Sequence, residues 1–334
     1  MTAATPIIEL KDVSKRFVKR LDLAAKIVNR LGGNVREEVV HAVDTVNLAV
    51  AEGEVVGLVG ESGCGKSTLG RVVAGIHEAS SGTLHYKGVD VSTLTGAAAR
   101  EVQLKVQMIF QDPMSSLNPR LRVDQIVGEA PHVHGIVDRK ALPGYVDEML
   151  LRVGLDPSYK RRYPHQFSGG QRQRIGIARA LSVKPDFLVC DEAVAALDVS
   201  IQAQVLNLFM KLREDFNLTY LFISHDLGVV EHLSDRVVIM YLGRVVESAP
   251  TGELFEAPNH PYTQALLAEV PRLESQRRVF VPIKGEIPSP LNPPSGCHFH
   301  PRCPHAHARC KAEVPALKEI APGRFSACHL NDAA

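Results

Sequence analysis

Residues 60–67 constrain the fold of this chain more than any other segment. An apolar run at 55–59 precedes them, and apolar residues recur at helical spacing from Leu69 to Ile76. This order predicts a buried strand, a glycine loop and a helix. Backbone N–H groups in such a loop, and the positive end of the helix, are suited to hold phosphate oxygens. The segment fits the pattern G-x-x-x-x-G-K-[ST] with Gly60, Glu61, Ser62, Gly63, Cys64, Gly65, Lys66 and Ser67.

Individual residues of this loop have separate predicted tasks. The glycines let the backbone curl around phosphates without Cβ clashes. Lys66 is expected to reach the β- and γ-phosphates, and Ser67 to supply a hydroxyl to Mg²⁺. Cys64 is interpreted as a small filler. Residues 60–68, Thr68 included, form the predicted nucleotide-binding segment.

A second apolar run, 187–190, ends in two carboxylates, Asp191 and Glu192. A strand that ends in an acid delivers it to the C-terminal edge of a parallel sheet. Asp191 is expected there among the Mg²⁺ ligands. Glu192 is expected to polarise the attacking water as general base. Beside the glycine loop, this pair predicts a nucleotide hydrolase.

A third motif opens a predicted helix with Ser168, Gly169, Gly170 and Gln171. Its hydroxyl, its backbone N–H groups and the helix N-terminus make a second anion cradle. One nucleotide has one triphosphate tail, which residues 60–67 already hold. The second cradle is therefore expected to act on a nucleotide bound elsewhere, most simply by a second copy across a dimer interface.

The remaining pattern predicts an α/β fold with a largely parallel sheet. A further strand is expected at 220–223, and a hairpin at 237–241 and 244–247. Residues 113–168 lack this alternation and predict an inserted helical lobe, with a helical stretch at 145–153.

Residues 18–41 place apolar side chains on one helical face, with basic side chains around it. They predict a basic helical insert. Two roles remain open for it: packing on the domain surface, or contact with lipid headgroups or a membrane partner.

The length and composition of the chain limit its possible cellular location and its number of domains. The chain has 334 residues, which predicts two domains or one domain with an appendage. Its net charge of +1 does not call for a nucleic-acid partner. No apolar run approaches the ~18 residues that span a bilayer, and the N-terminus lacks signal-peptide features. We expect a cytosolic chain that serves a membrane, if at all, as a peripheral subunit.

These motifs, in this order, resemble those of the ATP-binding subunits of ABC transporters. Gln111 in the segment Phe-Gln-Asp-Pro and His225 in Ser-His-Asp complete the set. Residues 108–119, 285–291 and 297–304 are similar to the oligopeptide and dipeptide importer branch.

The resemblance implies an ABC ATPase domain at 7–255, followed by a Pro/Cys-rich extension at 256–334. The domain would combine a RecA-like core, an antiparallel β element and a helical subdomain at about 113–168. A change of composition near 255–285 agrees with that boundary.

The resemblance also implies roles for single residues. Phe17 would stack on adenine, Gln111 would contact Mg²⁺ or the water and sense the membrane subunit, and His225 would bond the γ-phosphate. Asp198 would lie in the loop that crosses to the partner ATPase. One departure is that Ala193, Val194 and Ala195 stand where the family usually has Pro-Thr-Ser. A hydroxyl that could bond across the dimer is therefore missing, while activity is still expected.

The implied function is the ATP-hydrolysing motor of a bacterial di- or oligopeptide importer at the cytoplasmic face of the inner membrane. Its implied partners are a second ATPase subunit, identical or paralogous, two membrane permeases, and indirectly a periplasmic or lipid-anchored solute-binding protein. Alternatives are the same motor for nickel, glutathione or another small solute, and a soluble ABC ATPase working on DNA, ribosomes or an enzyme complex. A metal-binding regulator with a vestigial nucleotide site is disfavoured by intact Lys66, Asp191, Glu192 and His225.

Four cysteines crowd the C-terminal extension: Cys297, Cys303, Cys310 and Cys328. Their spacing lacks both the C-x₂-C of structural zinc sites and the short runs of ferredoxins. From the spacing, unligated thiols and a four-thiolate site of unknown metal both remain open, and five nearby histidines add zinc-compatible ligands. The resemblance implies a structural 4Fe–4S cluster, with Zn²⁺ as the alternative.

Overall fold

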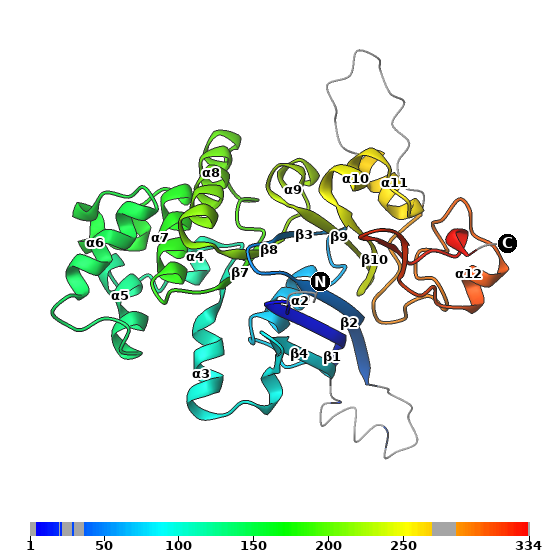
Figure 1. Ribbon diagram of the computed structural model, residues 1–334, viewed down its shortest axis with the longest axis horizontal. Helices are drawn as coiled ribbons and strands as arrows, with labels where there is room; N and C mark the ends of the chain where they lie inside the picture. Colours follow the sequence, from blue (N-terminus) through cyan, green and yellow to red (C-terminus); the bar gives the residue numbers. More distant parts are fainter. Residues whose placement is uncertain (1–4, 20, 22–28, 30–36, 269–284, 333–334) are drawn as a thin grey trace, which may run out of the picture.

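The computed structural model of the chain describes residues 5–19, 21, 29, 37–268 and 285–332. Figure 1 shows a group of helices at one end, two sheets in the middle and the C-terminal extension at the other end. Within the described residues, the larger sheet has eight strands in the order β11-β12-β10-β9-β3-β8-β7-β6. The smaller sheet has four, in the order β2-β1-β4-β5.

Five neighbouring strands of the larger sheet run parallel, as the sequence predicted. Three of them, β3, β7 and β8, are buried along their whole length because structure covers both faces of the sheet. The parallel strands are β3 (Val55–Val59), β6 (Val106–Ile109), β7 (Phe187–Asp191), β8 (Thr219–Ile223) and β9 (Arg236–Tyr241).

The two faces of this sheet bury alternate residues of the same strands. Tyr220 and Phe222 of β8 face a core that includes α7 (Gly169–Leu181) and α8 (Val199–Phe216). Leu221 and Ile223 face α2 (Lys66–Val73) and the smaller sheet. Further helices that complete the two layers are α3 (Gly96–Lys105) and α9 (Leu227–Leu233).

The helix after the glycine loop ends earlier than predicted. It stops at Val73, and Ile76, which was expected on its apolar face, lies beyond it and is exposed. Gly75 adopts a left-handed conformation with φ of 70°, and the N–H of Ile76 donates to the carbonyl of Arg71 at 2.8 Å. This glycine termination closes the helix and turns the chain away.

The smaller sheet corrects the two ends of the helix predicted at 18–41. Residues 18–19 extend β1, residues 38–41 belong to β2, and Lys19 pairs with Glu38. Cross-strand pairing of apolar residues, such as Val18 with Val39, outweighs the helical spacing at both ends of the segment. Positions 20, 22–28 and 30–36 lie outside the described residues. The strands are β1 (Ile8–Lys19), β2 (Glu38–Val50), β4 (Ser81–Tyr86) and β5 (Val89–Asp90).

The helical lobe that the fold class implied is present, with its helices between residues 113 and 152. The expected helical stretch at 145–153 corresponds to α6, and Figure 1 shows the lobe beyond the β7 end of the sheet. Its apolar residues join the core on the α7 and α8 side of the sheet. The helices of the lobe are α4 (Pro113–Ser116), α5 (Val123–Val133) and α6 (Leu142–Arg152).

The C-terminal extension is attached to the main sheet. The predicted hairpin of β9 and β10 (Arg244–Pro250) is present, and β12 pairs with β10 on its other side. Phe299, only 2% exposed, packs against Tyr241 and Tyr262. The extension thus shares a core with the ATPase domain. Its elements are α11 (Pro261–Ala268), α12 (Ala308–Ala312), β11 (Lys318–Ala321) and β12 (Arg324–Ser326), preceded by α10 (Thr251–Glu256).

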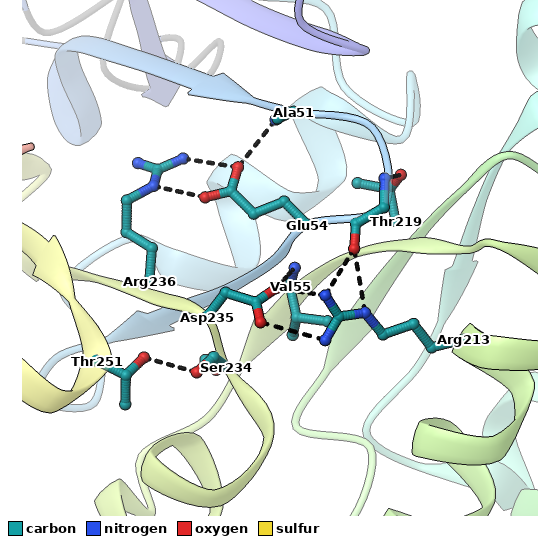
Figure 2. Close-up of polar contacts among 10 residues, drawn as sticks. Ala51, Glu54, Val55, Arg213, Thr219, Ser234, Asp235, Arg236 and Thr251 are labelled. Atoms are coloured by element: carbon teal, nitrogen blue, oxygen red, sulfur yellow. Dashed lines mark hydrogen bonds and ion pairs between the residues drawn. The ribbon is translucent and has the colours of Figure 1, made fainter.

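A polar network fixes the beginning of the central strands (Figure 2). Arg236 binds Glu54 through Nε at 2.7 Å, and Arg213 binds Asp235 through Nη2 at 2.6 Å. Asp235 also accepts from the N–H of Val55 at 2.8 Å. Because these contacts join β3 and β9 and the end of α8, they hold the strands in register. The opposite, C-terminal ends of the same strands are where the candidate site lies.

Candidate nucleotide-binding site

The glycine loop leaves β3 and enters α2 in a conformation that only small residues permit. A Cβ on Gly65 would collide with the carbonyl oxygen of Ala42, and one on Gly60 would collide with that of Met240. Gly65 also has a φ of 105°, in the left-handed region that favours glycine. The backbone can therefore approach a ligand closely, with the N-terminus of α2 directed at the same place.

Lys66 is 4% exposed and turned into its own loop. Its Nζ donates to the carbonyl oxygens of Gly60 at 2.7 Å and Glu61 at 3.0 Å. The amine is thus held inside the curve of the loop, where it can neutralise a bound phosphate chain.

Ser67 and Asp191 meet at the C-terminal edge of the sheet. The Ser67 hydroxyl donates to Oδ1 of Asp191 at 2.7 Å, although 124 residues separate them. Burial raises the pKa of Asp191, which is 2% exposed. A hydroxyl and a carboxylate in contact are the oxygen ligands that Mg²⁺ prefers, so these two residues fit a magnesium ion.

Glu192, the residue after Asp191, has an unusual backbone conformation. Its φ of 47° is left-handed, and its N–H donates to the carbonyl of Ile223 at 3.0 Å. Such strain costs about 1–3 kcal/mol and is common at functional sites. The carboxylate accepts from Nε2 of Gln111 at 2.7 Å and lies 3.3 Å from Nδ1 of His225. Gln111 and His225, from two separate motifs of the sequence, therefore converge on the Glu192 carboxylate.

A cavity of about 360 Å³ opens over the loop. Phe17, predicted to stack on a base, lines it and is 39% exposed, with an edge contact to His77. An aromatic ring at the rim offers an apolar surface on which a planar ligand can stack, and Nζ of Lys15 lies 5.2 Å from its centre. The cavity is lined by Phe17, Val40, Ala42, Ser62, Gly63, Gly65, Lys66, Ser67, Thr68, Gln111, Glu192 and Pro290.

Sequence reasoning missed three lining residues, Val40, Ala42 and Pro290, and the one most distant along the chain is Pro290. It belongs to the C-terminal extension, and its carbonyl accepts from the N–H of His41 at 3.1 Å. The sequence offered only a proline-rich composition as a signal, which does not say what a given proline contacts.

The motif at 168–171 lies apart from this cavity and contributes no residue to its lining. Ser168 caps α7: its hydroxyl accepts from the N–H of Gln171 at 3.3 Å, and the Gln171 side chain accepts from the N–H of Ser168 at 3.1 Å. A Cβ on Gly170 would collide with Ile201 of α8. Asp198, at the start of α8, is exposed and also outside the cavity lining. Both features are free to meet another molecule.

Packing explains part of the difference from the family pattern at residues 193–195. Ala193 and Val194 are each 2% exposed and join the core under the helical lobe. Apolar side chains suit this buried position, whereas Ala195 is exposed.

The four C-terminal cysteines form no disulfide with one another, and all belong to the extension. The N–H of Cys297 donates to the carbonyl of Cys310 at 2.8 Å. Burial raises the pKa of the Cys328 thiol, and the neighbouring Cys297, Cys303 and Cys310 raise it further. In the described part of the chain, no three Cys, His, Asp or Glu side chains stand close enough to hold one metal ion. The arrangement thus gathers four thiols without forming a single-ion site.

Comparisons with known proteins agree with this geometry. Residues 43–195 match the ABC transporter family, and residues 246–310 match the family described as oligopeptide/dipeptide transporter, C-terminal region. The chain is 51% identical to the oligopeptide transport ATP-binding protein AppF of Bacillus subtilis (strain 168), over 99% of each chain. It is 50% identical to a probable peptide ABC transporter ATP-binding protein, y4tS, of Sinorhizobium fredii, over 87% of this chain and 83% of the relative.

A solved structure is also similar. It is described as the dimeric, post-hydrolysis state of the ATP-binding cassette MJ0796 bound to ADP and Pi. The TM-score is 0.61 at 26% identity, covering 73% of this chain and 98% of the other. Separately, none of the helices in the described ranges has the length and apolar character needed to cross a membrane.

Proposed function

The chain belongs to the ABC transporter ATPase family, and from that premise we propose that it is the ATP-hydrolysing motor subunit of an importer of di- and oligopeptides. The observation that carries the proposal is the convergence of Gln111 and His225 on Glu192, beside the Ser67–Asp191 pair. The extension that matches the oligopeptide/dipeptide family, and relatives named for oligopeptide transport, support the choice of solute.

The loop residues are assigned to ATP binding. The N–H groups of 60–68 surround the triphosphate, and the amine of Lys66 neutralises its β- and γ-phosphates. The exposed ring of Phe17 stacks on adenine at the rim of the cavity. Ser67 and Asp191, with Gln111 at the edge, hold Mg²⁺, which neutralises charge on the phosphates when bound.

Glu192 is assigned as the general base. Its carboxylate accepts a proton from the attacking water while Gln111 orients that carboxylate through the 2.7 Å hydrogen bond. His225, 57% exposed, is assigned to the γ-phosphate, where it stabilises the charge that develops during attack.

Residues 168–171 are assigned to a nucleotide on a second ATPase subunit. Their position on α7, outside the cavity, supports this assignment. Two subunits arranged head to tail would close on two ATP molecules, with Asp198 crossing the interface. Closing and reopening would drive two membrane permeases between inward- and outward-facing states, with the chain bound at the cytoplasmic face of the inner membrane. A periplasmic or lipid-anchored solute-binding protein would deliver the peptide.

The four C-terminal thiols are proposed to hold a structural 4Fe–4S cluster, with Zn²⁺ as the alternative. The backbone contact between Cys297 and Cys310, and the lack of a disulfide among the four cysteines, support a shared thiolate site. Such a site would tie the segment around 297–328 together. The test is anaerobic purification followed by metal analysis and visible absorption. A colourless protein with stoichiometric zinc would exclude the iron–sulfur cluster, and a protein without metal would exclude both the cluster and zinc. Cys303→Ser should loosen the extension while Mg-ATP binding persists.

Reconstitution tests the transport function. The chain is combined with its permeases and solute-binding protein in proteoliposomes, and ATP-dependent uptake of a labelled tripeptide is measured. We expect uptake that competes with unlabelled peptides and not with nickel or glutathione. ATP hydrolysis without peptide uptake, together with nickel or glutathione uptake, would reassign the solute and retain the motor.

A further inference from the structure

Glu61 is an acidic residue at the second position of a loop assigned to bind a triphosphate. A carboxylate there opposes a negatively charged ligand unless a cation neutralises it. The side chain of Glu61 is 20% exposed, so water screens it only in part. Its surroundings therefore decide whether the loop can hold phosphates.

The C-terminal extension supplies that cation, from a residue 241 positions away. Nη1 of Arg302 donates to Oε2 of Glu61 at 2.7 Å, and Nη2 donates to Oε1 at 2.9 Å. This two-pronged geometry is the strong form of a carboxylate–guanidinium contact. The Arg302 side chain is 5% exposed, so the pair is shielded from competing ions.

Aromatic side chains hold Arg302 in place. Its guanidinium lies 5.9 Å from the centre of the Tyr241 ring, and Tyr241 packs against Tyr262 and Phe299. Tyr262 contacts the same loop from another side, because its hydroxyl accepts from the N–H of Glu61 at 2.9 Å. Both the backbone and the side chain of Glu61 are thus fixed by residues that follow β9.

We propose that Arg302 is a positioning residue of the ATP site, which neutralises Glu61 and holds the phosphate loop open to its ligand. The inference rests on the proposed ATPase function and deepens it, since it makes the folded extension a working part of the nucleotide site. Arg302 itself touches no substrate and acts through Glu61.

The test uses the full chain and a charge-removal cycle. Variants Arg302→Gln, Glu61→Gln and the double variant are titrated with Mg-ATP and, separately, with Mg-ADP. Arg302→Gln leaves Glu61 uncompensated and should raise the Kd for ATP about 10- to 100-fold, the range of a lost charge-assisted hydrogen bond. The loss should be larger for ATP than for ADP, because the additional phosphate carries additional negative charge.

The double variant separates neutralisation from mere structural support. Removal of both charges should restore ATP binding to within about threefold of the wild type. Arg309→Gln is the matched control: Arg309 also pairs with a glutamate of the extension, Glu313, at 2.7 Å, yet it should leave the Kd unchanged.

Every outcome bears on the inference. Wild-type affinity in Arg302→Gln overturns it, and so does a folded double variant that binds as weakly as the single one. If Arg302→Gln does not fold, the double variant decides alone: wild-type binding supports the inference, while weak binding or failure to fold overturns it. A wild-type chain that binds no ATP would instead overturn the proposed function.

Discussion

Nε2 of Gln111 and Oε2 of Glu192 are 2.7 Å apart, although the two residues come from different strands and 81 positions separate them. Gln111 follows β6 and Glu192 follows β7, and these strands are parallel neighbours. Gln111, which lies just before the helical lobe, is therefore hydrogen-bonded directly to the assigned base. If a membrane partner moves that lobe, we expect the position of the Glu192 carboxylate to change as well.

Glu192→Gln should abolish turnover and preserve ATP binding. The amide cannot accept the proton of the attacking water, while Lys66 and the loop remain unchanged. We expect kcat to fall about 10²- to 10⁴-fold and the ATP-bound dimer to accumulate on size-exclusion chromatography with Mg-ATP. The exposed Glu231→Gln is the control. Phosphate release by Glu192→Gln at a near wild-type rate would refute its role as base.

Lys66→Ala should lose nucleotide affinity. The amine now held by the carbonyls of Gly60 and Glu61 is the charge assigned to the phosphates. We expect the Kd for Mg-ATP to rise about 10- to 100-fold, measured by calorimetry. Unchanged affinity would show that the backbone N–H groups suffice.

Hydrolysis by the isolated chain should depend steeply on protein concentration. The motif at 168–171 does not line the cavity of its own chain, so we expect the motif of a second subunit to complete the site. Specific activity should rise with protein concentration in steady-state assays. Ser168→Ala should lower turnover without changing the Kd for ATP, because Ser168 is outside the cavity. Full activity from a monomer at every concentration would contradict this arrangement.

Acid should destabilise the extension through His260. Burial lowers its pKa to about 4 from 6.5, so the folded state keeps it neutral while the unfolded state protonates below 6.5. The stability that the neutral ring provides is fully present above pH 6.5 and is lost as pH falls toward 4, at most about 3 kcal/mol. Denaturant titrations between pH 4 and 7.5 measure it. His260→Asn keeps an acceptor for the N–H of Tyr262 and should flatten that part of the profile; an equal slope would exclude His260.

Phe299→Ala should destabilise the ATPase core as well as the extension. Phe299 packs against Tyr241 and Tyr262, so truncation leaves a cavity between the two regions. The expected loss is about 3–5 kcal/mol in the free energy of unfolding. Chemical denaturation should remain a single transition; a second transition, confined to the extension, would indicate that the extension unfolds independently.

The sequence predicted the parts of the site that depend on local pattern. The glycine loop, the acids after β7 and the hairpin of β9 and β10 each have a short-range cause, in backbone freedom or apolar periodicity. Their family order then implied the contact of Gln111 with the site. The residues that escaped prediction depend on distant pairing: Val18 and Val39 form a strand pair in place of a helix, and Pro290 and Arg302 reach the loop from the far end of the chain. Contacts between residues so far apart leave no pattern in the local sequence.

The attachment of β12 to β10 has a consequence for truncated versions of this protein. If the chain were cut at the predicted boundary after residue 255, the backbone groups of β10 at Glu247 and Ser248, now paired with Ser326 and Phe325, would face solvent. An exposed edge strand of that kind can pair with a strand of another molecule and so promote aggregation. In the intact chain the outermost strand is β11, which begins with the exposed charges of Lys318 and Glu319. We therefore expect the extension to protect β10 from edge-to-edge aggregation, and the shortened domain to precipitate under conditions in which the whole chain remains in solution.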